Sequence, residues 1–451
     1  MNINDTVSRA NQEIQGQDFE RFLTLVDESK FDVYESLRNE IGDVESKILL
    51  LKLTNLLVAK YEYSHRHTRL ISYPINLIVD PTNACGLHCP GCVHSKTPSA
   101  TEAFLWPSGH MTEQKFGKFI QEYGPYALQV IFANYGEPLL NRLTPQFIST
   151  TREYLVETVS STSLSVKKLD VDLLVLSGLD SLILSIDGAT KETYSIYRRG
   201  GDFDLVVSNV AQLVAAKKKH NAYAPFLAWQ FLVFEHNFHE IEKVNRLAQS
   251  IGVNELRLVK PGSVAWDDPS IVVKDSFEGY VITYDYSFMQ DRNNHNMMLA
   301  NLNRQVVDRH FSRRWLDRYK QINANLRQGS VNRRPACQWL YKSITIDGLG
   351  NVMPCCMAPS RDRELVYSSV GVADPYNSDM YVTSRAHFLN EGEHEIQING
   401  VDSESKPYCT FCSFQEEAKP LITPLHAKNY LEKVSIFGVL SGEAKSVLAD
   451  W

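Results

Sequence analysis

The chain has 451 residues, more than one ordinary hydrophobic core needs, which predicts two or three domains. Hydrophobic residues make up 43% and charged residues 22%, the composition of a soluble globular protein. The net charge of −7 argues against a nucleic-acid binder, which needs a basic face to neutralise phosphates. No apolar run reaches the length of a membrane span, and residues 1–30 are too polar for a signal peptide. We therefore expect a cytoplasmic protein whose eight cysteines are metal ligands or reactive thiols rather than disulfides.

The first segment of the chain has a helical pattern. Apolar residues recur at helical spacing over residues 5–70, without a strand or hairpin signal. We therefore expect a helical N-terminal extension over residues 1–70.

From residue 75 onward, short β-rich runs alternate with amphipathic stretches. The expected strands are Ile75–Asp80, Leu128–Ala133, Thr158–Ser165, Leu182–Asp187, Leu227–Phe234 and Glu255–Lys260, and the expected helices include Thr112–Tyr123, Val206–His220 and Phe238–Ile251. This alternation predicts a parallel sheet with right-handed crossovers, closed or nearly closed into a barrel. The fold class expected over residues 71–262 is α/β, a partial (βα)6 TIM-like barrel with its chemistry at the carboxyl ends of the strands.

The remaining segments lose this rhythm. Residues 263–335 are rich in aromatic and charged side chains and are interpreted as a linker of helix and loop. Ser343–Asp347 and Val352–Pro354 predict a small hairpin. We expect a small C-terminal domain over residues 336–415 and a helical tail over residues 416–451.

Three cysteines follow the first expected strand directly. Cys85, Cys89 and Cys92 have Cys-x3-Cys-x2-Cys spacing. Three thiolates can hold three irons of a [4Fe–4S] cube and leave the fourth iron open, whereas electron-transfer clusters are saturated by four cysteines. The open iron invites a small bidentate ligand, and S-adenosylmethionine (SAM) fits through its amino and carboxylate groups. The alternative is a zinc site completed by His88 or His94, although zinc sites more often use Cys-x2-Cys pairs.

This motif resembles the radical SAM superfamily, whose reduced cluster cleaves SAM to a 5′-deoxyadenosyl radical. The family marks the end of its second strand with a Gly-Gly-Glu-like segment that binds the methionyl amino group, and Tyr135-Gly136-Glu137 stands at that place. The resemblance assigns Ser185 and one of Arg198 or Arg199 to the ribose and carboxylate of SAM. The residues that it implies for cofactor binding are Tyr135, Gly136, Glu137, Ser185, Asp187, Arg198, Arg199 and Gln230.

Two departures from the family pattern concern the adenine contacts. Gly91 stands where an aromatic residue usually precedes the third cysteine, and Ser161-Thr162-Ser163 replaces the usual Thr-Asn-Gly after the third strand. Neither departure affects the ligation of the cluster, but both leave extra room in the site.

The other five cysteines form a second set. Four of them can saturate a [4Fe–4S] cluster, and the set resembles a twitch domain, the shortened SPASM domain of the family. These expected ligands are Cys337, Cys355, Cys409 and Cys412, with a structural zinc as the alternative. Cys356 is then spare. It either donates a hydrogen atom to a carbon radical or is a small buried residue beside its ligand neighbour.

A barrel, one auxiliary cluster, a spare thiol and helical flanks together resemble the radical SAM epimerases that convert L to D residues in ribosomally made peptides, including those of the proteusin type. We favour such an epimerase, with Cys356 as the hydrogen donor. The alternatives are a dehydrogenase or epimerase of a sugar or aminocyclitol, another peptide modification such as a cross-link, and a non-catalytic iron–sulfur or zinc scaffold. The hypotheses in which the protein is an enzyme imply a peptide or small-molecule substrate and a flavodoxin- or ferredoxin-type electron donor.

Overall fold

The computed structural model describes residues 43–95, 107–262, 268–284, 337–356, 366–388 and 409. Within these residues, one ten-stranded sheet has the order β10-β9-β8-β1-β2-β3-β4-β5-β6-β7. Six parallel strands lie next to one another in chain order, as the expected barrel requires. They are β1 (Asn76–Val79), β2 (Gln129–Phe132), β3 (Glu157–Thr162), β4 (Ser181–Ser185), β5 (Phe226–Leu232) and β6 (Glu255–Val259).

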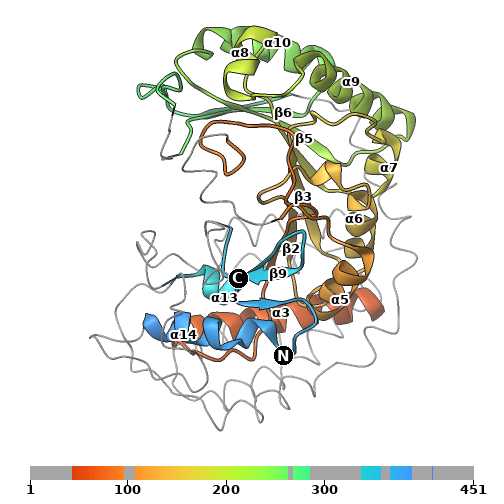
Figure 1. Ribbon diagram of the computed structural model, residues 1–451. Coiled ribbons are helices and arrows are strands. Elements are labelled where there is room, and N and C mark those ends of the chain that lie inside the picture. The colour runs from red at the N-terminus through yellow and green to blue at the C-terminus, as the bar shows by residue number, and fades with distance from the viewer. Residues whose placement is uncertain are drawn as a thin grey trace, which may run out of the picture.

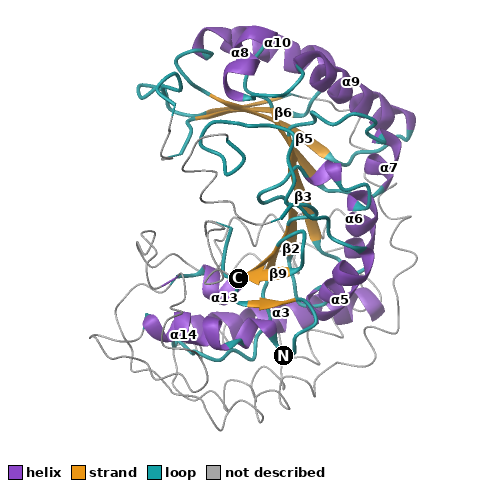
Figure 2. Cartoon of the chain, in the orientation of Figure 1, coloured by secondary structure: helices purple, strands orange, loops and turns teal. Residues whose placement is uncertain are grey.

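Helices follow the outer side of this curved sheet (Figures 1 and 2). They are α5 (Glu113–Tyr123), α6 (Thr144–Arg152), α7 (Val171–Leu176), α8 (Lys191–Tyr197), α9 (Phe203–Lys219) and α10 (Ile241–Ile251). Buried side chains alternate along β3 and β4, which places one face of the sheet in the core beneath the helices. The other face points into the arc.

Local signals explain where several of these helices begin and end. The side chains of Thr112, Asp170, Thr190 and Asp202 accept hydrogen bonds from backbone N–H groups in the first turns of α5, α7, α8 and α9. The helix α10 ends at Gly252, whose φ of 100° is the left-handed conformation that glycine adopts without strain.

At both edges of the six parallel strands, further strands continue the sheet, and within the described residues the two edges do not pair with each other to close a barrel. The strand β7 (Tyr280–Thr283) pairs antiparallel with β6, and β8 (Ser343–Ile346) pairs parallel with β1. The expected linker therefore contributes a strand that the sequence pattern did not predict. The predicted hairpin is present as β8 and β9 (Asn351–Met353), and it extends the barrel's own sheet. A two-residue strand, β10 (Ser368–Ser369), pairs with β9 at the edge.

The N-terminal and C-terminal parts of the described chain meet below the sheet (Figure 1). The helix α3 (Asp43–Ser64) confirms the helical prediction over its length, whereas residues 1–42 and the predicted tail over 416–451 lie outside the described residues. The helix α13 (Trp339–Lys342) packs against α3, and α14 (Asp379–His387) packs against α13.

Arg385 of α14 joins these segments. Its side chain is fully buried and donates to the carbonyl oxygens of Leu340 at 2.9 Å, Tyr376 at 2.9 Å and Thr68 at 3.1 Å. Its guanidinium also lies 4.7 Å from the centre of the Tyr376 ring. Since a buried cation is tolerated only when its donors are satisfied, Arg385 connects α14 specifically to the α3 and α13 region.

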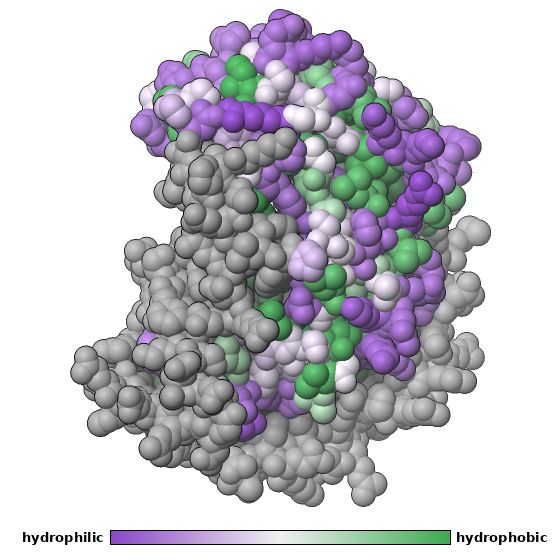
Figure 3. Space-filling view, viewed as in Figure 1, coloured by the Kyte–Doolittle hydropathy of each residue, from purple (hydrophilic) through white to green (hydrophobic). Residues whose placement is uncertain are grey.

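The outer surface is mixed in character. Figure 3 shows hydrophilic side chains over much of the helical face, with hydrophobic ones between them. No helix of the described segments combines the length and apolar character that a membrane crossing needs.

Replacing Arg385 by Met should lower the free energy of unfolding by about 3 kcal/mol, because it leaves several buried carbonyls without a donor. Arg69→Met is the matched control, since Arg69 is part-exposed and lies 3.8 Å from the exposed Asp379. The control should change the free energy by less than about 0.5 kcal/mol. Urea unfolding measures both, and equal losses would contradict the role of Arg385.

Candidate active site at the carboxyl ends of the strands

The cysteine triplet lies in the loop that follows β1, at the carboxyl end of the strand. Cys89 is buried in an apolar cluster with Tyr197, Phe234 and Ile271, and Cys85 and Cys92 pack against the same cluster. The Cys92 N–H donates to the Cys89 carbonyl at 3.1 Å. Burial raises the pKa of Cys85 to about 12 and also raises the pKa of Cys89 and Cys92. A metal centre here must therefore displace the thiol protons when it binds.

The donor set fits a cluster. Three thiols, close in sequence, share one apolar pocket, and a cube binds each thiolate at a different iron. Among the described residues, no group of three Cys, His, Asp or Glu side chains converges closely enough to hold a single ion. The two histidines of the zinc alternative each use one ring nitrogen in a hydrogen bond: His88 Nδ1 lies 3.0 Å from the His94 carbonyl, and His94 Nε2 lies 3.0 Å from the Tyr135 carbonyl.

Asp80, the residue after β1, organises the loop after β2. Its carboxylate is fully buried and accepts from the N–H groups of Tyr135 at 3.1 Å and Gly136 at 3.2 Å. At Gly136 a Cβ atom would lie 1.7 Å from the Thr82 carbonyl oxygen, so only glycine fits. Asp80 was not among the predicted site residues, although its position at the carboxyl end of a barrel strand is typical of functional residues.

Glu137 is held by the segment that departs from the family pattern. Its carboxylate is 4% exposed and accepts from Thr162 Oγ1 at 2.5 Å, Ser163 N at 2.8 Å and Ser163 Oγ at 2.7 Å. The Leu139 N–H is a fourth donor at 3.3 Å. These four donors use the acceptor capacity of a carboxylate. In this structure, Glu137 therefore ties the loops after β2 and β3 together, and its predicted contact with the SAM ammonium stays a prediction.

A row of polar side chains crosses the middle of the sheet. Ser185 and Gln230 are register partners on β4 and β5. Ser161 Oγ of β3 lies 3.2 Å from Ser185 Oγ. All three side chains are only partly buried, unlike their neighbours on the core side. The structure thus brings Ser185 and Gln230, two predicted cofactor contacts, next to each other.

Asp187 and the two arginines connect this row to the triplet. Asp187 is fully buried and accepts from Leu232 N at 2.6 Å and Arg198 Nε at 2.5 Å. Arg198 Nη1 lies 3.9 Å from Cys89 Sγ. Arg199 instead pairs with Asp268, while its carbonyl accepts from the His88 N–H at 2.8 Å. The segment after α8 is therefore packed directly onto the cysteine loop.

The family comparison agrees with this geometry, since residues 79–229 match the model described as the Radical SAM superfamily. This part of the chain is a radical SAM domain. A search of curated proteins gave no match.

Three solved structures match part of this chain. SuiB of Streptococcus suis bound to S-adenosylmethionine has a TM-score of 0.41 at 13% identity, covering 68% of this chain and 66% of SuiB. Native anSMEcpe with bound AdoMet has a TM-score of 0.41 at 15% identity, covering 70% of this chain and 83% of that chain. BtrN in complex with AdoMet and 2-DOIA has a TM-score of 0.35 at 14% identity, covering 70% of this chain and 88% of that chain. The matched part therefore spans just under two thirds of SuiB.

The second cysteine set lies on the hairpin side of the radical SAM domain. Cys337 precedes α13 and β8, and Cys355 and Cys356 follow β9. Because β9 runs antiparallel to β8, both groups lie toward the amino end of β8, at the opposite edge from the triplet. Burial raises the pKa of Tyr381, whose ring packs edge-on against Tyr367, and the Tyr367 hydroxyl oxygen lies 3.4 Å from the Cys409 N–H. Cys412 lies outside the described residues.

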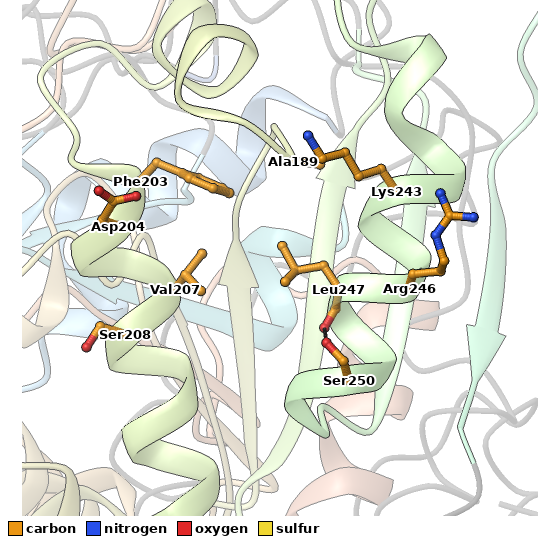
Figure 4. A pocket seen from close by; sticks show the side chains of 9 residues that line it. All are labelled: Ala189, Phe203, Asp204, Val207, Ser208, Lys243, Arg246, Leu247 and Ser250. Carbon is orange, nitrogen blue, oxygen red and sulfur yellow. Dashed lines mark hydrogen bonds between the residues drawn. The ribbon is translucent and has the colours of Figure 1, made fainter.

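A separate groove opens on the outer helical layer. Figure 4 shows Phe203 and Val207 of α9 facing Leu247 of α10, with Lys243 and Arg246 at its rim. This groove lies between the covering helices, and its lining does not include the cysteine triplet or the polar row on β3, β4 and β5.

Burial raises the pKa of Asp80 from its ordinary value of 3.8 to about 8. The folded chain then holds this proton more tightly than the unfolded chain, so the associated stability falls as the pH rises toward 8. Asp80→Asn has no such proton. The free energy of unfolding of the wild type minus that of D80N should therefore decrease between about pH 5 and pH 8.5. Anaerobic urea unfolding across this range measures the difference, and an increase with pH would contradict a protonated Asp80.

Proposed function

We propose that this chain is a radical SAM enzyme that abstracts a hydrogen atom from a substrate C–H bond. The observation that carries the proposal is the packing of three cysteines against one apolar cluster beyond β1, with Cys89 buried and Cys85 and Cys92 partly buried, within the residues that match the radical SAM model. With the cluster and SAM bound, the site would supply a 5′-deoxyadenosyl radical. The chain's own residues hold and orient the cofactor and select the substrate hydrogen.

The strand-end residues take distinct roles in this proposal. Cys85, Cys89 and Cys92 hold the cluster. Ser185 and Gln230, which are adjacent across β4 and β5, contact the ribose of SAM. The other proposed contacts to SAM come from Tyr135, Gly136, Asp187 and either Arg198 or Arg199, and from Glu137 once the SAM ammonium replaces one of its four present donors.

Asp80 and Asp187 also act on the backbone. Asp80 binds the N–H groups of Tyr135 and Gly136, and Asp187 binds that of Leu232. Through these contacts the two carboxylates fix the loops that would surround the cofactor.

The second cysteine set is proposed to hold an auxiliary [4Fe–4S] cluster. Cys337, Cys355 and Cys409 are its described ligands, and Cys412 would be the fourth. Cys409 is buried, and its N–H lies 3.4 Å from the Tyr367 hydroxyl oxygen. A flavodoxin- or ferredoxin-type protein would supply electrons to the enzyme.

The reaction that we favour is the epimerisation of L to D residues in a ribosomally made peptide. Cys356 is not needed as a ligand, and the residue is only partly buried. Its thiol would return a hydrogen atom to the face of the substrate radical opposite the first abstraction, and one electron from the donor protein with one proton would convert the resulting thiyl radical back to the thiol. The second candidate is oxidation of a sugar or aminocyclitol, in which the auxiliary cluster accepts the electron of the substrate radical.

Replacing Cys85, Cys89 and Cys92 together by Ala should abolish the reductive cleavage of SAM, because only this triplet leaves an iron open for SAM. About four irons per chain should be lost while the auxiliary cluster persists. Iron analysis and detection of 5′-deoxyadenosine measure both effects. Continued formation of 5′-deoxyadenosine would refute the enzyme proposal, and a colourless wild type with stoichiometric zinc would favour a non-catalytic scaffold.

Cys356→Ala separates the two reactions. An epimerase with this variant should still cleave SAM and abstract a substrate hydrogen, but should fail to release the inverted product. In D2O the wild type should place one deuterium at each inverted carbon, since a thiol exchanges its hydrogen with solvent. Mass spectrometry of the product measures this label. A product lighter by two hydrogens and without deuterium would end the epimerase proposal and support oxidation.

A further inference from the structure

Arg198 has an unusual place in the radical SAM domain. It ends α8, and its side chain is 14% exposed between the fully buried Asp187 and the cysteine triplet. Its Nε donates to Asp187 Oδ2 at 2.5 Å, while its Nη1 reaches Cys89 Sγ at 3.9 Å. One planar guanidinium therefore links a carboxylate to a cysteine that is expected to bind iron.

We propose that Arg198 is a positioning residue that donates an N–H···S hydrogen bond to the Cys89 thiolate and so raises the reduction potential of the cluster. This inference rests on the proposed function, because it requires a cluster at the triplet. It goes beyond the assignment of Arg198 to the SAM carboxylate. Among the described residues nothing engages Nη2, so that nitrogen stays available for SAM while Nη1 faces the sulfur.

The surrounding backbone fixes this orientation. Asp187 is held by the Leu232 N–H at 2.6 Å, and the Arg198 N–H donates to the Tyr194 carbonyl at 2.8 Å. Gly200 follows with a φ of 85°, and a Cβ atom there would lie 3.1 Å from the Gly86 carbonyl oxygen in the cysteine loop. The chain therefore turns closely over the triplet loop, which holds the Arg198 backbone near the cysteines.

The electrostatic consequence follows from the location of the charge. Reduction adds one electron to the cluster, and a cationic hydrogen-bond donor at a ligand sulfur stabilises the more negative state. Hydrogen bonds to the sulfurs are among the factors that set cluster potentials. The contact is buried, so solvent screens it little. Asp187 partly offsets this charge, but Arg198 is the group that donates a hydrogen bond to the Cys89 sulfur, while Asp187 accepts from Arg198 Nε.

Arg199 provides the matched control. It is the next residue and carries the same charge, but its guanidinium is more exposed and pairs with Asp268, and its Nη2 lies 3.5 Å from Ser270 Oγ. No hydrogen bond joins the Arg199 side chain to a described cysteine. Arg198→Gln and Arg199→Gln therefore make the same chemical change at two different distances from the cluster.

The experiment is a redox titration of the reconstituted full-length protein, followed by electron paramagnetic resonance without SAM. The C85A/C89A/C92A variant supplies the auxiliary-cluster signal for subtraction. At a fixed solution potential, R198Q should lower the ratio of reduced to oxidised triplet cluster about tenfold, which is 59 mV for a one-electron couple. R199Q should leave this ratio unchanged. Iron content is measured first in each variant.

Arg198→Lys covers the case in which R198Q fails to retain iron. Lysine keeps the charge but lacks the planar fork that contacts Asp187 and Cys89 together, so R198K should shift the ratio in the same direction by less. An unchanged potential in an iron-replete R198Q or R198K, or equal shifts in R198Q and R199Q, would overturn the role of Arg198. A wild type without any triplet-dependent signal would instead refute the proposed function itself.

Discussion

The candidate active site depends on buried carboxyl groups at the ends of β1, β2 and β4. Asp80 follows β1 and binds N–H groups that follow β2, while Glu137 follows β2 and binds the Ser163 N–H after β3. Asp187 follows β4 and binds the N–H of Leu232, the last residue of β5. A buried carboxylate is costly unless it is hydrogen-bonded, so each of these groups requires the next loop to present its donors. The loops after β2 and β3 are therefore each held by a carboxyl group from the loop before them, and Asp187 likewise holds the end of β5.

This arrangement explains why the departure after the third strand is compatible with the fold. Thr162 and Ser163 supply two hydroxyls and one N–H to Glu137, so the segment satisfies the carboxylate that it faces. Ser161 takes a different direction and meets Ser185 on the inner row. The departure removes the usual side chains but preserves the connection between β2 and β3.

The two cysteine sets are joined through one strand pair. The strand β8 pairs in parallel with β1 along four residues, and the Asp80 N–H donates to the Ile346 carbonyl at 2.8 Å. The triplet lies beyond one end of this pair, and Cys337 and Cys355 lie toward the other. Four residues of strand span about 13 Å. The paired strands β1 and β8 therefore separate the two proposed iron sites along the strand direction.

The features that could be predicted from the sequence are those set by residues close together in the chain. The apolar runs located β1 to β6 within a few residues, Thr112 and the apolar spacing predicted α5, and the Cys-x3-Cys-x2-Cys motif identified the radical SAM domain. These signals are short-range, because hydrophobic periodicity and capping are set by neighbours in the chain. The strand β7 was not predicted, because its apolar residues do not alternate with polar ones, and Tyr280 and Val281 are exposed in the folded chain.

Contacts between residues far apart in the chain could be identified only from the folded structure. Nothing near Glu137 in the sequence indicates that Thr162 and Ser163 will fill its acceptor positions, and nothing near Ser343 indicates that β8 will join β1. The two adjacent arginines are equivalent in sequence, yet Arg198 faces Cys89 and Arg199 faces Asp268. The physical reason is that strand pairing and buried hydrogen bonds are chosen by the folded arrangement as a whole, since a polar group takes its partner from whichever segment packs against it.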